Sequence, residues 1–401
     1  MKLNLLASAI LAVALGSTSA VAEEVKVGAL MGITGPLANF IPPILNAARL
    51  AEKDVNDGGG ILGGEKFSLV VVDGQAAAQP SVDAASKLVN LENVAAIMGG
   101  LSSGATIASA NAVSIPNGVL QVSPTSTSPA MTDMEDNDFL FRIVPSDNYQ
   151  GQVLARMVLE EKLNKVAVAY VNNDYGVGIA ATFKAAYESM GGTVTAFEKH
   201  EDKKNSYRGE LASMASSGAE ALVVIAYAGG SGAKIVKQSL ENGFFDRFVG
   251  TDGLRDDLLI EQIGAEALAT TFFSAPTSPD DNPVGETFHA RFDEEFGEGS
   301  DKPFVDQSYD ATMLIALAIE KAGSVDRTKV RDALREVANA PGEQIGPGEW
   351  KKAVALLADG KDINYEGVSG SHEFDENGDV AGFIGKFVVD GDSYKQTAIF
   401  K

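Results

Sequence analysis

Short apolar runs alternate with longer amphipathic stretches along most of this chain, and this alternation restricts its fold more than any other feature. The runs are about four to eight residues long and rich in Val, Ile, Ala and Phe, as expected of buried strands in a parallel sheet. They fall into two series, at residues 25–30, 67–72, 95–98, 118–122 and 139–144, and then at 166–171, 193–197, 221–226 and 248–249. The pattern predicts an α/β protein with two doubly wound parallel-sheet lobes.

The stretches between the runs have the apolar spacing of crossover helices, at residues 44–55, 81–91, 106–113, 175–190, 207–216 and 233–242. The remainder is more helical, with predicted helices at 288–296, 307–321 and 328–338 and terminal strands at 383–389 and 397–400. Turn-rich segments near 145–146, 276–283 and 367–370 are candidate crossings between lobes. We therefore expect an N-terminal lobe from residues 23–144 plus about 276–366, and a C-terminal lobe from residues 145–275 plus about 367–401.

The first residues have the pattern of an export signal. Lys2 is followed by an apolar run from Leu3 to Leu15 and then by Ala20-Val21-Ala22, an A-x-A cleavage pattern. The apolar run is too short for a confident membrane span. We expect residues 1–22 to be a signal peptide removed before Glu23, which places the mature protein in the periplasm. No Cys stands at the cleavage point, so a lipid-anchored form is not expected.

Composition excludes several kinds of chemistry. The 401 residues include no Cys and 3 His, which rules out disulfides, thiol nucleophiles and Cys-ligated zinc and leaves little for a His-rich metal site. We therefore expect no metal and no cofactor. The formal net charge of −23 repels phosphate backbones, so nucleic acid is a poor partner. We expect a monomer that binds a small-molecule solute.

Candidate binding residues follow the predicted strands. In open parallel sheets, ligands bind outside the carboxyl ends of the strands, where backbone N–H groups converge. In the first lobe these segments are uncharged and rich in hydroxyls, and they contain Phe40, Ser102, Ser103, Thr125, Ser126 and Thr127. In the second lobe they supply aromatic rings and a carboxylate, from Tyr175, Tyr227 and Asp252.

These two sets of side chains suit a zwitterion. Ser103 and Thr127 can hold a carboxylate through hydroxyls and backbone donors. Asp252 and the carbonyl of Thr125 can accept hydrogen bonds from an ammonium group, and the two tyrosines can cover a small side chain. Each residue also has an ordinary structural interpretation, as a helix cap, a packing residue or a turn residue.

One segment suggests an enzyme. Gly100-Leu101-Ser102-Ser103-Gly104 fits the G-x-S-x-G elbow of serine hydrolases and lies between a predicted strand and a predicted helix. Ser102 would be the nucleophile, with Asp252 and either His289 or His372 completing a triad. This is a remote alternative, because His289 has a surface helix position and His372 lies in a turn-rich segment. We expect no enzymatic activity.

A second segment, Asp375-Glu376-Asn377-Gly378-Asp379, resembles a calcium loop because acidic and amide side chains crowd together. Its Gly falls fourth, whereas the EF-hand pattern needs Gly at the sixth position and Glu at the twelfth, where this chain has Lys386. An Asn-Gly hairpin turn between Phe374 and Phe383 is the expected structure.

Several motifs in one order carry a resemblance to a known family. They are Gly35-Pro36-Leu37, the Gly-Gly-Ile-Leu-Gly-Gly turn at 59–64, Leu101-Ser102-Ser103-Gly104, residues 123–129 and Asp174-Tyr175-Gly176. The chain resembles the Leu/Ile/Val-binding family, the type I periplasmic substrate-binding proteins of ABC transporters, over nearly its whole mature length. That resemblance implies two lobes joined by three crossovers, which close on a solute and deliver it to a membrane permease.

The resemblance also implies roles for individual residues. The family's carboxylate-binding serine falls on Ser103, its carbonyl acceptor on Thr125 and its hydroxyl on Thr127. Its second-lobe tyrosine falls on Tyr175, and the acid that meets the ammonium falls on Asp252, where the classical branched-chain binders are similar but have Glu. Phe40 stands where Tyr is common, and the next aromatic matches Tyr227 or, shifted by one, Ala228. An amino acid or similar zwitterion is the implied solute, and an amide, an aromatic carboxylate or another small organic acid is the alternative.

Overall fold

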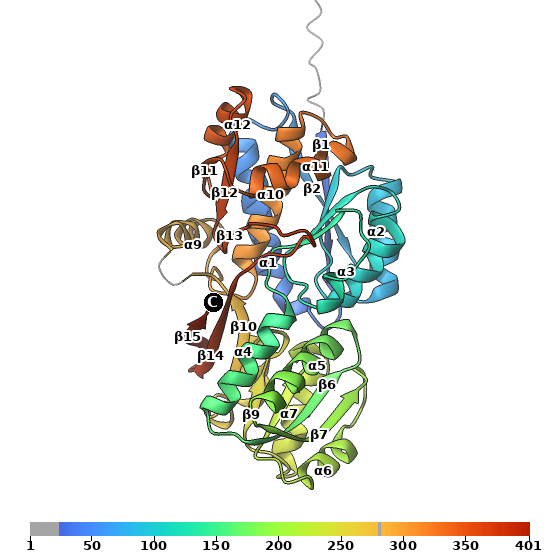
Figure 1. Ribbon diagram of the computed structural model, residues 1–401, viewed down its shortest axis with the longest axis vertical. Coiled ribbons are helices and arrows are strands. Elements are labelled where there is room, and N and C mark those ends of the chain that lie inside the picture. The colour runs from blue at the N-terminus through green and yellow to red at the C-terminus, as the bar shows by residue number, and fades with distance from the viewer. Residues whose placement is uncertain (1–23, 280–281) are drawn as a thin grey trace, which may run out of the picture.

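The computed structural model describes residues 24–279 and 282–401. Its helices and strands form two lobes that lie one above the other along the long axis of the molecule (Figure 1). The first lobe contains a five-stranded sheet of order β2-β1-β3-β4-β5, in which all neighbouring strands are parallel. These strands are β1 (Glu24–Met31), β2 (Lys66–Asp73), β3 (Ala96–Gly99), β4 (Leu120–Ser123) and β5 (Leu140–Arg142).

The second lobe contains a seven-stranded sheet of order β15-β14-β10-β9-β8-β6-β7. Its strands are β6 (Lys165–Val171), β7 (Thr193–His200), β8 (Ala221–Ile225), β9 (Phe248–Gly250), β10 (Phe272–Thr277), β14 (Phe383–Asp390) and β15 (Ser393–Phe400). The last two strands form a hairpin that pairs antiparallel with β10. This sheet is therefore mixed, because a two-residue turn at Gly391 and Asp392 reverses the chain.

β10 was not predicted, because residues 276–283 have the composition of a turn. Pro276 lacks an N–H, which normally excludes it from a central strand. Here β10 pairs with β9 only at Phe272 and Phe273, and Pro276 lies beyond the end of that ladder, opposite Ile384 of β14. The missing N–H of Pro276 therefore removes no hydrogen bond between β10 and β9.

The parallel parts of the two sheets share one winding order. β7-β6-β8-β9-β10 repeats β2-β1-β3-β4-β5, so each sheet has a switch point, between β1 and β3 in the first lobe and between β6 and β8 in the second. Ligands of open α/β sheets bind outside the carboxyl ends of strands at such a point. The fold class predicted from the sequence is confirmed.

Helices cover both sheets (Figure 1). On the first lobe they are α1 (Ile41–Asp57), α2 (Ala78–Asn90), α3 (Ser103–Ser109), α9 (Pro283–Phe296), α10 (Val305–Ala322), α11 (Arg327–Ala338) and α12 (Trp350–Ala358). On the second lobe they are α4 (Asp147–Glu160), α5 (Asp174–Ser189), α6 (Arg208–Ala215), α7 (Ala233–Glu241) and α8 (Asp257–Ile263). Short 3-10 or π turns occur at 38–40, 110–114, 129–131, 228–232, 252–254 and 266–268, and β11 (Glu343–Ile345), β12 (Ile363–Gly367) and β13 (Gly370–Ser371) form a small third sheet.

α10 is the central helix of the first lobe. It is buried continuously from Gln307 to Ile319 and packs against α1 and α11. Its Asp310 carboxylate accepts hydrogen bonds from the Tyr365 hydroxyl (2.7 Å) and from the backbone N–H of Val368 (3.0 Å) and Ser369 (2.7 Å). These bonds fix the segment through which the chain leaves the first lobe for the last time.

The chain passes between the lobes three times: from β5 to α4, from β10 to α9, and from β13 to β14. The lobe boundaries predicted from the sequence stay a prediction at the level of single residues. The predicted signal peptide, residues 1–22, lies outside the described residues. Within the described part of the chain, no helix has both the length and the apolar character that a bilayer span requires.

A buried arginine ties the third crossing to the loop after β4. Arg142 in β5 is fully buried, and its guanidinium donates to the carbonyls of Thr127 (2.9 Å) and Ser128 (2.7 Å) and to the carboxylate of Asp379 (2.5 Å).

Asp379 belongs to the segment that resembled a calcium loop. This segment is a turn, since the Asp375 carboxylate accepts from the backbone N–H of Asn377 (2.8 Å) and Asp379 (3.0 Å). The expected hairpin is wrong, because no strand precedes the turn and the chain is crossing between lobes there.

Candidate ligand-binding site

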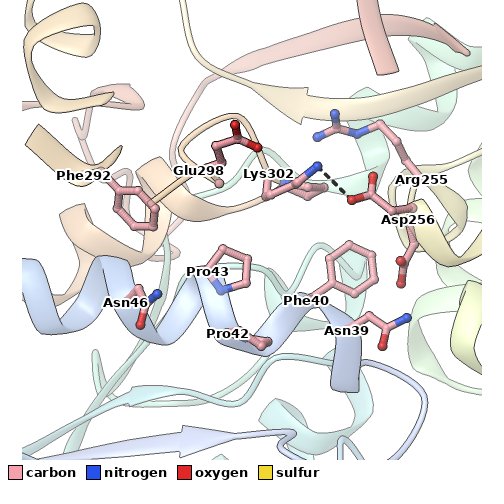
Figure 2. A pocket seen from close by; sticks show the side chains of 13 residues that line it. Asn39, Phe40, Pro42, Pro43, Asn46, Arg255, Asp256, Phe292, Glu298 and Lys302 are labelled. Carbon is pink, nitrogen blue, oxygen red and sulfur yellow. Dashed lines mark ion pairs between the residues drawn. The ribbon is translucent and has the colours of Figure 1, made fainter. Parts of the chain in front are cut away.

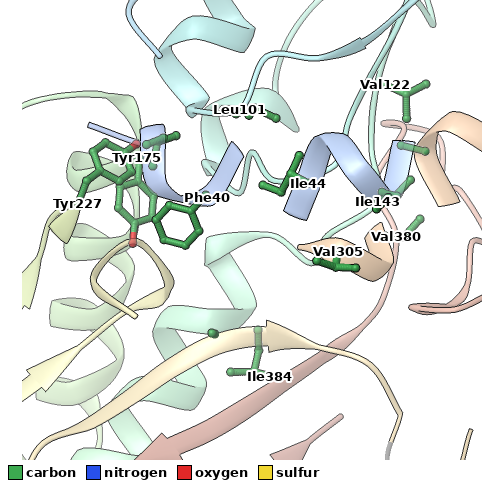
Figure 3. Packing of buried hydrophobic residues seen from close by; sticks show 14 of the residues in the cluster. Phe40, Ile44, Leu101, Val122, Ile143, Tyr175, Tyr227, Val305, Val380 and Ile384 are labelled. Carbon is green, nitrogen blue, oxygen red and sulfur yellow. The ribbon is translucent and has the colours of Figure 1, made fainter. Parts of the chain in front are cut away.

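A narrow cavity lies between the lobes, where the two switch points face each other. Its first-lobe wall consists of Leu37, Phe40, Ile44, Leu101, Ser103 and Thr125, with Phe304 from the start of α10. Its second-lobe wall consists of Tyr175, Tyr227, Asp252 and Gly253, which follow β6, β8 and β9. The space open to the centre of a water molecule is about 20 Å³. Figure 3 shows how closely the rings of Phe40, Tyr175 and Tyr227 gather there.

Two hydroxyl residues face this cavity from the first lobe. Ser103 is 2% exposed, and its Oγ accepts a hydrogen bond from the backbone N–H of Ser128 (3.2 Å). No acceptor among the described residues takes the hydroxyl hydrogen of Ser103, so that hydrogen is available to a carboxylate in the cavity. The Thr125 hydroxyl donates to the carbonyl of Leu101 (2.5 Å), which leaves the Thr125 carbonyl as its acceptor for a ligand.

Three other predicted residues do not line the cavity. The Ser102 hydroxyl donates to the carbonyl of Ala76 (2.9 Å) and caps α3 by accepting from the N–H of Ala105 (3.4 Å). Ser126 shares a hydrogen bond with Thr106 (2.7 Å). The Thr127 hydroxyl is buried, and its hydrogen bond with Asp147 acts to lower the pKa of that carboxyl. Ligand contact by these three stays a prediction.

On the second-lobe wall, Asp252 is held by donors from two helices. Its Oδ1 accepts hydrogen bonds from Gln150 Nε2 of α4 (2.8 Å) and from the hydroxyl of Tyr175 on α5 (3.1 Å). The Tyr175 hydroxyl also shares a hydrogen bond with Thr251 (2.6 Å). For Asp252 Oδ2, no hydrogen bond is found with any described residue. One carboxylate oxygen is thus fixed by the protein and the other remains for a ligand.

Burial dominates the electrostatics of this wall. It raises the pKa of Asp252 to about 6, although the hydrogen bonds from Gln150 and Tyr175 favour the charged form. Burial and the charge of Asp252 raise the pKa of Asp147 well above its ordinary value. The same two causes raise the pKa of Tyr175 and of Tyr227. Both tyrosines are therefore neutral phenols, and their rings stack with centroids 5.2 Å apart and planes at 17°. Tyr227, not Ala228, lines the cavity.

The opposite end of the cavity is apolar. Leu37, Ile44 and Leu101 line it together with the rings of Phe40 and Phe304, whose centroids are 6.4 Å apart. Phe304 has φ 66° and ψ 12°, a left-handed conformation that bulky residues rarely adopt. Such a conformation costs free energy and persists where the surrounding structure fixes it, often at a binding site. Here it places an aromatic ring against the cavity.

Phe304, Gln150 and Asp147 were missed by sequence reasoning. Gln150 and Asp147 lie in the first turn of α4, a helix that was not predicted, and their polar side chains are buried ahead of an apolar stripe that runs from Val153 to Val158. Ser146 before α4 has the character of a helix N-cap, accepting from the N–H of Asn148 (3.2 Å), and could have revealed the helix. Nothing in the sequence around Phe304 signals its left-handed backbone.

The hydrolase alternative is wrong for a geometric reason. Its two candidate histidines are committed elsewhere: His289 hydrogen-bonds Asp306 (2.7 Å), and His372 is buried beside Ser369 (3.2 Å). Neither forms a hydrogen bond with Ser102, whose hydroxyl donates to Ala76, and Asp252 interacts with Gln150 and Tyr175. A nucleophile–base–acid sequence is not assembled among the described residues.

Comparisons with known proteins agree with this geometry. The profile of a family described as periplasmic binding protein matches residues 24–353. A Leu/Ile/Val-binding protein homolog 3 from Brucella melitensis is 29% identical over 330 residues, covering 81% of this chain and 87% of that protein. A leucine-, isoleucine-, valine-, threonine-, and alanine-binding protein from Pseudomonas aeruginosa is 27% identical, covering 83% of this chain and 88% of that protein. The crystal structure of a leucine binding protein, LivK, from Thermotoga maritima has a TM-score of 0.79 and 26% identity, covering 94% of this chain and 98% of the other.

The hydrogen bond from Gln150 sets the acidity of Asp252, and this can be measured. Replacing Gln150→Leu removes the Nε2 donor that stabilises the carboxylate, so the pKa of Asp252 should rise above about 6. Carboxyl ¹³C NMR titration reports that pKa, and Asp252→Asn identifies its resonance. Gln152→Leu is the matched control, because Gln152 is exposed on the same helix and donates only to the carbonyl of Asn148 (2.8 Å). An unchanged Asp252 titration in Gln150→Leu would contradict this account.

Proposed function

This chain belongs to the family of periplasmic binding proteins, and we propose that it captures a small amino acid as a zwitterion between its lobes and delivers it to the membrane permease of an ABC transporter. We further propose that the mature protein acts in the periplasm as a monomer and that its site binds without catalysing a reaction.

The observation that carries this proposal is the opposite chemistry of the two cavity walls. The first wall offers the free hydroxyl hydrogen of Ser103, which suits a carboxylate. The second wall offers Asp252 Oδ2, and Thr125, which also lines the cavity, has a backbone carbonyl that can accept, which together suit an ammonium group. A zwitterionic amino acid bridges these walls, and its binding therefore favours the closed arrangement of the lobes.

The remaining lining supports an apolar side chain. Leu37, Phe40, Ile44, Leu101 and Phe304 provide no charge and few polar atoms, so an aliphatic side chain gains free energy by leaving water there. Relatives from Brucella melitensis and Pseudomonas aeruginosa carry names that state binding of branched-chain amino acids. L-leucine, L-isoleucine and L-valine are accordingly the first solutes to test.

The second candidate is an aromatic carboxylate or another small organic acid. It is favoured by the raised pKa of Asp252, because a carboxyl that protonates more readily can donate a hydrogen bond to a ligand carboxylate. The stacked Tyr175 and Tyr227 rings would also suit an aromatic ligand. Calorimetry with leucine and with benzoate separates the two candidates, since benzoate lacks an ammonium group.

Closure of the lobes brings their backbones into contact at three glycines. A Cβ atom at Gly229 would lie 2.6 Å from the carbonyl oxygen of Pro36, one at Gly178 would lie 2.7 Å from Pro129 Cδ, and one at Gly104 would lie 2.9 Å from an Asp174 carboxylate oxygen. Each pair joins the two lobes. Beside them, the Ser128 hydroxyl donates to the carbonyl of Asp174 (2.9 Å). The contact at Gly229 is the most restrictive, because the Pro36 carbonyl is backbone, whereas the Asp174 carboxylate near Gly104 can rotate away.

The amino-acid assignment predicts distinct losses on the two walls. Asp252→Ala should leave the fold intact and abolish leucine binding, because the ammonium group loses its counter-charge. Ser103→Ala should weaken binding by about 1–3 kcal/mol, the value of a hydrogen bond to a charged group. Isothermal titration calorimetry measures both. Unchanged leucine affinity in Asp252→Ala would refute the ammonium assignment.

The glycine contacts predict a variant that folds but does not close. Gly229→Ala places a methyl group against the rigid backbone of Pro36, so leucine affinity should fall about tenfold or more, for an overpacking cost of about 1–3 kcal/mol. Small-angle X-ray scattering should then show no decrease in radius of gyration when leucine is added. Gly209→Ala is the control, because no heavy atom lies within 4 Å of its Cβ position. Normal compaction of Gly229→Ala with leucine would contradict the proposal.

A further inference from the structure

A buried arginine beside the cavity has no ionic partner. Arg255 follows the turn that carries Asp252, is 6% exposed, and packs its guanidinium over the ring of Phe387 at 4.0 Å. Its Nε is buried without a hydrogen bond, and no carboxylate within residues 24–279 and 282–401 lies at ion-pairing distance. A buried charge is costly unless it is paired, and burial lowers the pKa of Arg255 to about 10. The Arg255 guanidinium is therefore buried without an ion pair among the described residues, although the more distant charges of Asp252, Asp301 and Asp257 favour its charged form.

Arg255 faces a second chamber at the mouth of the cleft (Figure 2). This outer chamber has a volume of about 230 Å³, and both lobes line it: Phe40, Pro43 and Phe292 from the first lobe, and Arg255 and Asp256 from the second. Phe40 also lines the inner cavity, so its side chain separates the two spaces. The apolar end of the inner cavity is thus the end that adjoins the outer chamber.

The outer chamber also contains one basic and three acidic side chains besides Arg255. Lys302 pairs with Asp257 across the cleft at 2.8 Å, as the dashed line in Figure 2 marks. Asp256 caps α8 through Oδ1, which accepts from the N–H of Leu258 (2.9 Å), whereas its Oδ2 is buried without a hydrogen bond, and Glu298 is exposed. Of the two basic groups in the chamber, Arg255 is the one without an ion pair among the described residues, so its guanidinium can pair with an added anion.

We propose that the outer chamber is a carboxylate subsite, in which Arg255 binds an acidic group at the far end of an amino-acid side chain. This inference rests on the proposed function, which places the zwitterionic end of the ligand between Ser103 and Asp252. The side chain then runs along the apolar lining toward Phe40, and its terminal carboxylate passes that ring to meet the guanidinium. Guanidinium is the group that binds carboxylates with two parallel hydrogen bonds, and the stack on Phe387 holds it in place.

A matched pair of ligands tests this subsite. L-norleucine and L-2-aminoadipate have side chains of equal carbon number, one ending in a methyl group and the other in a carboxylate. We expect the wild-type protein to bind 2-aminoadipate at least about tenfold more tightly than norleucine in isothermal titration calorimetry. Arg255→Met keeps an unbranched side chain over Phe387 and removes the charge, so it should reverse that preference while norleucine affinity changes about twofold or less.

Controls separate the possible failures. Arg208→Met should change neither affinity, because Arg208 pairs with Glu241 on the surface at 3.1 Å. A titration of norleucine with added sodium acetate tests whether a separate carboxylate can occupy the subsite. If acetate strengthens norleucine binding in the wild-type protein but not in Arg255→Met, the chamber binds anions that are not part of the amino acid. That result overturns the proposal that the ligand's own side chain reaches Arg255. If the wild-type protein binds norleucine but does not bind 2-aminoadipate more tightly, the carboxylate subsite is refuted and the proposed function is not. This result does not depend on whether Arg255→Met folds. Failure of every α-amino acid to bind refutes the proposed function instead.

Discussion

The carboxyl ends of two parallel sheets open into the same cleft, and the position of every residue in the site depends on this arrangement. The shared winding order places the switch point of each sheet beside the other lobe. Loops that are far apart in the sequence, such as those containing Ser103, Tyr175 and Asp252, therefore meet around one cavity. Neither lobe alone supplies both walls of this cavity, so a ligand bound there would contact both lobes.

Burial determines what this cavity can recognise. Asp252 is removed from water, and its charged form is supported mainly by Gln150 and Tyr175. That support is incomplete, since the pKa is still raised, and a ligand ammonium would supply the missing stabilisation. Asp147 and Thr127 are buried nearby, and their hydrogen bond partly offsets the burial that raises the pKa of Asp147.

Much of the fold and part of the site follow from local patterns. The apolar runs locate β1 to β9. The residues that follow these strands include Ser103, Thr125, Tyr175, Tyr227 and Asp252, which line the cavity because the topology of the sheets brings the carboxyl ends of these strands together. The failures share a cause in tertiary structure. α4 buries the polar Asp147 and Gln150 in its first turn, ahead of its apolar stripe from Val153 to Val158. β10 tolerates Pro276 only because β9 ends before it. Phe304 reaches the cavity through a backbone conformation that no pattern signals.

The central claim is that an ammonium group pairs with the charged form of Asp252, and the pH dependence of affinity tests it most directly. The amino and carboxyl groups of leucine do not titrate near neutral pH, whereas Asp252 has a pKa of about 6. Protonation of Asp252 removes the counter-charge, so the leucine association constant should be constant above about pH 7 and fall about tenfold per pH unit below 6. Isothermal titration calorimetry over this range should show that fall in the wild-type protein and a weak, nearly pH-independent affinity in Asp252→Asn. A wild-type affinity that does not change as the pH falls through 6 would contradict the account.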